Sequence, residues 1–110
     1  LALMASGGNG QGFAFHGYLP AKPEARAAAI RRIEAASLAT GAAQLFIETP
    51  YRNVALLGAL VATCRPETTL TVAADLTLAT ETVDSLPIRE WRRRDAAAWA
   101  KRPAMFVLQA

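Results

Sequence analysis

The chain has 110 residues, of which 53% are hydrophobic and 19% charged, and its formal net charge is +3. A chain of this size forms one domain that buries roughly 65% of its unfolded surface in a single core, and this composition excludes a disordered tail. The apolar runs end well before the roughly 18 residues that a transmembrane helix needs. We therefore expect a cytoplasmic domain without membrane contact.

The first predicted strand is followed by the longest predicted helix. Residues 13–19 alternate aromatic and smaller side chains, which is typical of a strand. The helix begins at Pro23, a favoured first helical residue, has Glu24 in its electropositive first turn, and ends at Gly41. We expect its outer face to carry Arg26, Arg31, Arg32 and Glu34.

A second strand and helix follow directly. Residues 43–47 form a short apolar run, as expected for a strand that is covered on both faces. Thr49 is predicted to cap the next helix and Pro50 to be its first residue, because both residue types are favoured there. Apolar residues then recur at helical spacing as far as Cys64.

The last third of the chain predicts three strands and further helix. Residues 69–73 are rich in β-branched side chains, and residues 81–86 predict a fourth, more exposed strand. Residues 87–91 and 95–101 predict one interrupted helix or two short ones, and residues 104–108 a final apolar strand. The order β-α-β-α-β-β-α-β predicts an α/β domain, a mixed sheet of about five strands flanked by three to four helices.

Three features resemble functional sites, but the sequence around each one argues against that interpretation. The glycine-rich residues 7–12 precede a strand, whereas a phosphate-binding loop follows a strand and opens a helix. His16 lies in an apolar strand without a second histidine, which favours a structural or surface role. Cys64 is the only cysteine and lies at the end of an apolar helix, which favours a core position. We therefore expect no metal site and no disulfide.

Two acidic residues stand at the ends of predicted central strands. Glu48 follows the second strand and Asp75 the third. We expect neighbouring strands to bring both to one rim of the sheet, where ligands bind in open α/β folds. The alternative is structural, because acids near a helix N-terminus are stabilised by about 0.3–1 kcal/mol from the helix dipole. Both interpretations stay open on spacing alone.

Three motifs resemble those of a known family. Residues 15–20 read Phe-His-Gly-Tyr-Leu-Pro, residues 46–52 read Phe-Ile-Glu-Thr-Pro-Tyr-Arg, and residues 73–77 read Ala-Ala-Asp-Leu-Thr, followed by Glu81. In this order and spacing they resemble the C-terminal half of the tetrapyrrole (corrin/porphyrin) methylase family, over nearly the whole chain. The branch that they resemble most methylates a ribose 2′-hydroxyl of small-subunit ribosomal RNA.

The resemblance implies a two-domain methyltransferase that uses S-adenosylmethionine and forms a homodimer, with the cofactor in the cleft between its domains. Residues 1–110 would be the single C-terminal domain, and the N-terminal domain of the same protein its partner. The start at Leu1 and the apolar run that stops two residues before the end lead to the same expectation of a piece of a larger protein. Alone, this domain is expected to be inactive.

In the family, backbone groups and apolar side chains at the strand ends of this half hold the adenine and ribose. An adenine site needs apolar walls with few polar groups, which alanine and methionine can supply. No general base is assigned, so methyl transfer would depend on positioning the sulfonium carbon against its acceptor. Carried onto matching positions, the cofactor contacts are Glu48, Thr49, Ala73, Ala74, Asp75, Leu76, Pro103, Ala104 and Met105.

Other functions stay open beside RNA methylation. Ala74 and Leu78 stand where the RNA branch has arginine and lysine, which motivates a cofactor-binding or regulatory module without turnover. Residues 102–104, Arg-Pro-Ala, resemble the Ser-Pro-Ala of corrin and porphyrin methylases, so a tetrapyrrole ring carbon is the second candidate acceptor. A basic RNA-binding domain is disfavoured by the small net charge and by the expected lack of an exposed aromatic surface.

Overall fold

The computed structural model describes residues 12–75, 82–94, 99 and 102–110, and the elements within them follow the predicted order. Most of the predicted helix over residues 95–101, and Glu81, lie outside the described residues. None of the described helices combines the length and apolarity needed to cross a bilayer. The elements are β1 (Phe13–Tyr18), α2 (Pro23–Thr40), β2 (Ala43–Glu48), α3 (Asn53–Thr63), β3 (Thr69–Ala74), β4 (Thr82–Pro87), α4 (Ile88–Trp91) and β5 (Ala104–Gln109).

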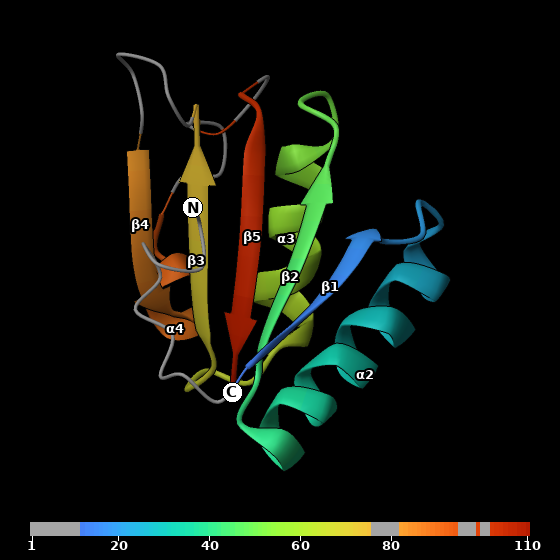
Figure 1. Cartoon of the computed structure of the whole chain (residues 1–110). Coiled ribbons are helices and arrows are strands. Elements are labelled where there is room, and N and C mark those ends of the chain that lie inside the picture. The colour runs from blue at the N-terminus through green and yellow to red at the C-terminus, as the bar shows by residue number, and fades with distance from the viewer. Residues whose placement is uncertain (1–11, 76–81, 95–98, 100–101) are drawn as a thin grey trace.

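The strands form one mixed sheet in the order β1-β2-β5-β3-β4 (Figure 1). The strand β1 pairs with β2 in parallel, and all other neighbours are antiparallel. The last strand in sequence, β5, therefore lies between β2 and β3. Since both run antiparallel to β5, they run parallel to each other and end at the same edge of the sheet.

The described helices all pack on one face of the sheet (Figure 1). There the rings of Phe46 on β2 and Phe106 on β5 stack with centroids 5.8 Å apart, and both residues are fully buried. They share one cluster with residues of all three helices, among them Ile33, Leu60 and Ile88. Alternate strand residues point to opposite faces, so the other half of the sheet residues cannot enter this core.

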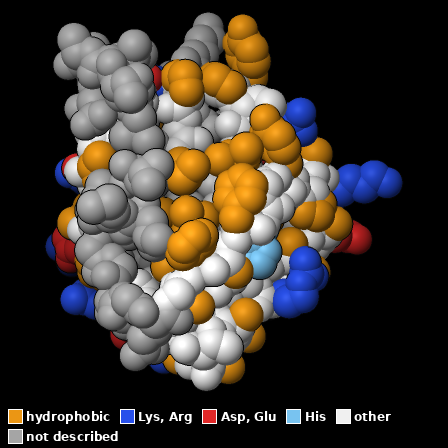
Figure 2. All heavy atoms as spheres, in the orientation of Figure 1, with side chains coloured by type: hydrophobic (Ala, Val, Ile, Leu, Met, Phe, Trp, Pro, Cys, Tyr) orange, Lys and Arg blue, Asp and Glu red, His pale blue; other side chains and the backbone are white. Residues whose placement is uncertain are grey.

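The opposite face carries no described helix, and hydrophobic side chains gather on the part of it that is visible in Figure 2. Among the described residues, a small buried cluster on this face consists of the strand residues Ala43, Leu45, Ala73 and Val107. The aromatic side chains of β1 stay exposed, by 57% at Phe13, 58% at Phe15 and 63% at Tyr18. The expected lack of exposed aromatic residues is therefore wrong, because β1 is an edge strand with a neighbour on one side only.

The predicted end of α2 is confirmed, whereas the predicted start of α3 is wrong. Gly41 adopts a left-handed conformation with φ 76°, and its N–H donates to the carbonyl of Ser37. Thr49 does not cap a helix; instead the Arg52 N–H donates to the Thr49 carbonyl over 2.9 Å, which closes a turn, and α3 begins at Asn53. Proline suits the second position of such a turn as well as the first turn of a helix.

The predicted outer face of α2 is half correct. Arg31 and Arg32 are exposed, but Arg26 and Glu34 are buried, with only 6% and 8% exposure. The Glu34 carboxylate accepts hydrogen bonds from the Arg65 N–H over 2.8 Å and from the Thr68 hydroxyl over 2.5 Å. Polar partners on other elements thus draw both charged side chains inward.

We predict that Phe46→Ala lowers the free energy of unfolding by about 3–5 kcal/mol, because it removes a fully buried ring and leaves a cavity against Phe106. Phe15→Ala, which truncates a ring that is 58% exposed, is the matched control and should cost less than about 1 kcal/mol. Urea unfolding of both variants measures the difference. Equal losses would contradict this assignment of the core.

Candidate functional site

Three of the predicted site segments meet at one edge of the sheet. Glu48 at the end of β2 is paired with Ala104 at the start of β5, and Ala104 is paired with Ala74 at the end of β3. In the next row, Met105 lies between Ile47 and Ala73. Chain segments that are far apart in sequence thus form one continuous rim.

The reason that Glu48 and Asp75 share this rim differs from the one predicted. Their strands, β2 and β3, are not neighbours, because β5 runs between them. The antiparallel start of β5 at Ala104 separates the two acids and contributes its own residues to the rim. The rim is therefore built from two strand ends and one strand start.

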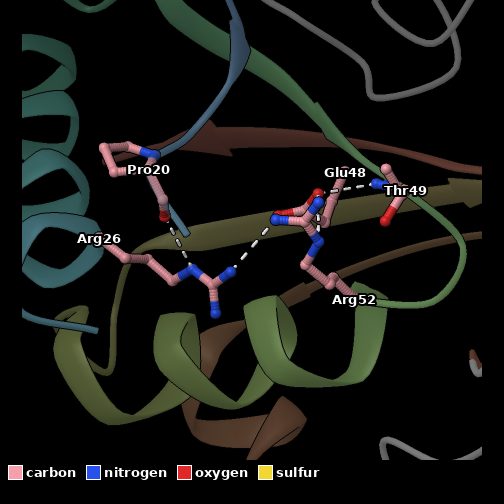
Figure 3. Close-up of polar contacts among 5 residues, drawn as sticks. All are labelled: Pro20, Arg26, Glu48, Thr49 and Arg52. Atoms are coloured by element: carbon pink, nitrogen blue, oxygen red, sulfur yellow. Dashed lines mark hydrogen bonds and ion pairs between the residues drawn. The ribbon is translucent and has the colours of Figure 1, made fainter. Parts of the chain in front are cut away.

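The Glu48 carboxylate is held by protein groups (Figure 3). Its Oε1 accepts the Thr49 N–H over 2.8 Å and lies 3.9 Å from Nε of Arg52. Its Oε2 lies 3.4 Å from Nη2 of Arg26, whose Nε also donates to the carbonyl of Pro20 over 3.2 Å. Glu48 therefore fixes the turn between β2 and α3 and ties it to the start of α2.

Glu48, Arg26 and Arg52 form one charged cluster. The side chains of Glu48 and Arg26 are only 2% and 7% exposed, so each needs the other to compensate for lost hydration. The Arg52 side chain is 51% exposed and brings its cationic head to the rim. The arrangement gives Glu48 a structural role, and a ligand at this turn would meet backbone and Arg52 rather than the carboxylate.

Asp75 is held in a comparable way beyond the end of β3. Its backbone is left-handed, with φ 55°, a conformation that aspartate tolerates better than most residues. Its N–H donates to the carbonyl of Pro103 over 2.9 Å, and its Oδ2 accepts Nε of Arg102 over 2.7 Å. Both predicted acids thus pair with arginines. The partner of Asp75 is Arg102, which directly precedes the predicted site residue Pro103.

Two residues at this edge were missed by reasoning from the sequence. Asn53, fully buried at the start of α3, donates from Nδ2 to the Arg102 carbonyl, and its Oδ1 has no hydrogen-bond partner within the described part of the chain. Arg102 was considered only as the first residue of the Arg-Pro-Ala segment, without a structural role of its own. Its position directly before Pro103 was the available signal, but the partner Asp75 is 27 residues away and no local pattern indicates it.

The remaining predicted site residues differ in what they offer. Ala74 and Ala104 belong to the cluster on the helix face, whereas Ala73 and Met105 belong to the opposite face. Their side chains therefore do not form one wall, and a ligand at the rim would contact backbone and small side chains of both rows. Pro103 is exposed, and Leu76 lies outside the described residues.

His16 and Cys64, for which the sequence argued against a chemical role, lie outside the rim. His16 is exposed on β1, and its Nε2 lies 2.6 Å from Oε1 of Gln44. Burial, reinforced by the nearby Glu34 carboxylate, raises the pKa of the Cys64 thiol to about 12, which disfavours the nucleophilic thiolate. Within the residues that the structure describes, no group of three potential metal ligands comes together.

Comparison with known proteins supports the fold. No family model and no curated protein matches the sequence. Among solved structures, the methyltransferase CobJ matches with a TM-score of 0.61 and 17% sequence identity, over 98% of this chain and 45% of the CobJ chain. The chain therefore spans less than half of the length of CobJ. The match confirms the fold class predicted from the sequence, an α/β domain with a mixed sheet of five strands.

We predict that Glu48→Gln destabilises the domain by about 3–5 kcal/mol, because it leaves the buried Arg26 guanidinium without its anion. Glu67 is the matched control: its side chain is 67% exposed and lies 3.7 Å from Arg65, so Glu67→Gln should cost less than about 1 kcal/mol. Urea unfolding at neutral pH tests both. A loss below about 1 kcal/mol for Glu48→Gln would show that this cluster does not organise the turn.

Proposed function

We propose that this chain is the C-terminal domain of an S-adenosylmethionine-dependent methyltransferase of the tetrapyrrole methylase family. Its rim at Glu48, Ala74 and Ala104 would be one side of the cofactor cleft. The observation that carries the proposal is that residues 46–52 and 73–77, two of the three motifs, meet the Arg-Pro-Ala segment of residues 102–104 at one sheet edge. The fold shared with the methyltransferase CobJ supports it.

The chemistry of the rim fits a nucleoside. Alanine at positions 73, 74 and 104 supplies small apolar side chains, and adenine recognition needs apolar surface beside a few backbone donors and acceptors. The buried Oδ1 of Asn53, which has no hydrogen-bond partner among the described residues, adds an acceptor close to this edge. Thr49, Pro103 and Met105 would contact the cofactor through backbone groups or through apolar side-chain atoms.

When bound, S-adenosylmethionine would supply a methyl group on a positively charged sulfur. The residues of this chain would then act by positioning. Glu48, through Arg26 and Arg52, fixes the β2–α3 turn, and Asp75 fixes the end of β3 against Pro103. No residue of the rim is assigned as a general base, so proton removal from the acceptor would depend on the rest of the protein.

We also propose that the whole protein contains an N-terminal domain and forms a homodimer. The match to only 45% of CobJ supports the first point. The exposed aromatic residues of β1, Phe13, Phe15 and Tyr18, support further protein beside this edge of the sheet. The domain alone would lack the other wall of the cleft and would not turn over.

For the acceptor, the motif resemblance favours a ribose 2′-hydroxyl of small-subunit ribosomal RNA, and the Arg-Pro-Ala of residues 102–104 favours a tetrapyrrole ring carbon. Both acceptors carry anionic groups, so the exposed Arg31 and Arg32 of α2 would suit either. Single-turnover methyl transfer by the complete protein to each acceptor distinguishes them, and transfer to neither would favour a module without turnover.

Calorimetric titration of S-adenosylhomocysteine tests the proposal. We expect the complete protein to bind this product with micromolar affinity or better, and the 110-residue domain to bind at least tenfold more weakly, since the domain offers only one side of the cleft. The domain is the matched control for nonspecific binding. No binding to the complete protein would contradict the proposed function while leaving the fold unaffected.

A further inference from the structure

We infer that Arg102 is the positioning residue of this rim. Its guanidinium and its carbonyl oxygen together fix the end of β3, the start of β4 and the start of α3 against the start of β5. The mechanical part of this inference depends on the geometry alone. Its consequence for cofactor binding rests on the proposed function.

The guanidinium joins two strands at their open ends. Nε of Arg102 donates to Oδ2 of Asp75 over 2.7 Å, and Nη2 donates to the hydroxyl of Thr82 over 2.8 Å. Asp75 directly follows β3 and Thr82 begins β4, so one side chain holds both sides of this hairpin at the rim. The planar fork of arginine permits two such bonds at fixed geometry, which a lysine ammonium does not reproduce.

The Arg102–Asp75 pair is shielded from water. The side chains are 25% and 9% exposed, and a short charge-assisted bond in such surroundings is stronger than a typical surface ion pair. The Asp75 N–H also donates to the carbonyl of Pro103, the residue after Arg102. Two separate bonds therefore join the left-handed Asp75 to the segment that leads into β5.

The backbone of Arg102 makes the third connection. Its carbonyl accepts Nδ2 of Asn53, which is fully buried and is the first residue of α3. Asn53 directly follows the turn that Glu48 organises. Arg102 thus links the two sides of the proposed cofactor rim, the β2–α3 turn and the end of β3.

The arginine itself is supported by aromatic packing. Its guanidinium carbon lies 5.2 Å from the centroid of the Trp99 ring, within the range of a cation–π contact. Trp99 in turn packs against Trp91 of α4, with centroids 5.8 Å apart. The position of Arg102 is therefore set by the core and does not depend on a ligand.

The chain offers a matched control in Arg94. This arginine also lies over a tryptophan, 5.6 Å from the Trp91 ring, and its Nη1 donates to Oδ2 of Asp84 over 2.8 Å. Asp84 lies within β4, where it pairs with Val72, and not at the rim. Arg94→Gln thus removes the same type of interaction from the middle of β4 rather than from the rim.

The test uses Arg102→Gln, Arg102→Lys and Arg94→Gln in the complete protein, with S-adenosylhomocysteine titrated by calorimetry. We expect Arg102→Gln to raise the Kd at least tenfold and Arg94→Gln to change it less than twofold. Arg102→Lys should recover part of the loss, because an ammonium can reach Asp75 but cannot hold Asp75 and Thr82 together. Wild-type affinity in Arg102→Gln would overturn the inference.

Amide hydrogen exchange separates this inference from the proposed function. In Arg102→Gln we expect the Asp75 amide, which bonds to Pro103, to exchange at least tenfold faster, and in Arg94→Gln to exchange at the wild-type rate. If the wild type bound no S-adenosylhomocysteine, the proposed function would fail. The exchange rates would still show whether Arg102 holds Asp75 against Pro103. Equal exchange at Asp75 in both variants would overturn the inference. Should Arg102→Gln not fold, Asp75→Asn gives the same two readouts.

Discussion

The central position of β5 is the constraint on which the rest of this structure depends. Because the last strand pairs antiparallel with both β2 and β3, these two strands run in the same direction and end at one edge. The same insertion sets Ala104 opposite both Glu48 and Ala74. It also stacks Phe106 on Phe46, so the pairing that builds the core builds the rim as well.

At that rim, two acidic residues are organised by arginines from elsewhere in the chain. Glu48 is held by Arg26 and Arg52, and Asp75 by Arg102. A carboxylate removed from water needs such partners, and its bonds to them hold the adjoining chain segments in place. The rim is therefore a preorganised surface with few free charges, which suits a function based on positioning a bound group.

The periodicity of the sequence predicted every described element, because each depends on local patterns such as the glycine that ends α2. It failed where a local pattern permits two outcomes: Pro50 suits a turn as well as a helix start, and the structure has the turn. It also failed where partners are distant. Arg26 and Glu34 were placed outside because nothing near them indicates Glu48 or Thr68, and Asn53 and Arg102 were missed for the same reason.

The most direct test of the cofactor rim is a crystal structure of the complete protein with S-adenosylhomocysteine bound. We expect the adenosyl group to lie at the edge formed by the ends of β2 and β3 and the start of β5, against Ala74 and Ala104, with Glu48 still paired to Arg26. An adenosyl group bound elsewhere, for example on the sheet face opposite the described helices, would contradict this account of the rim.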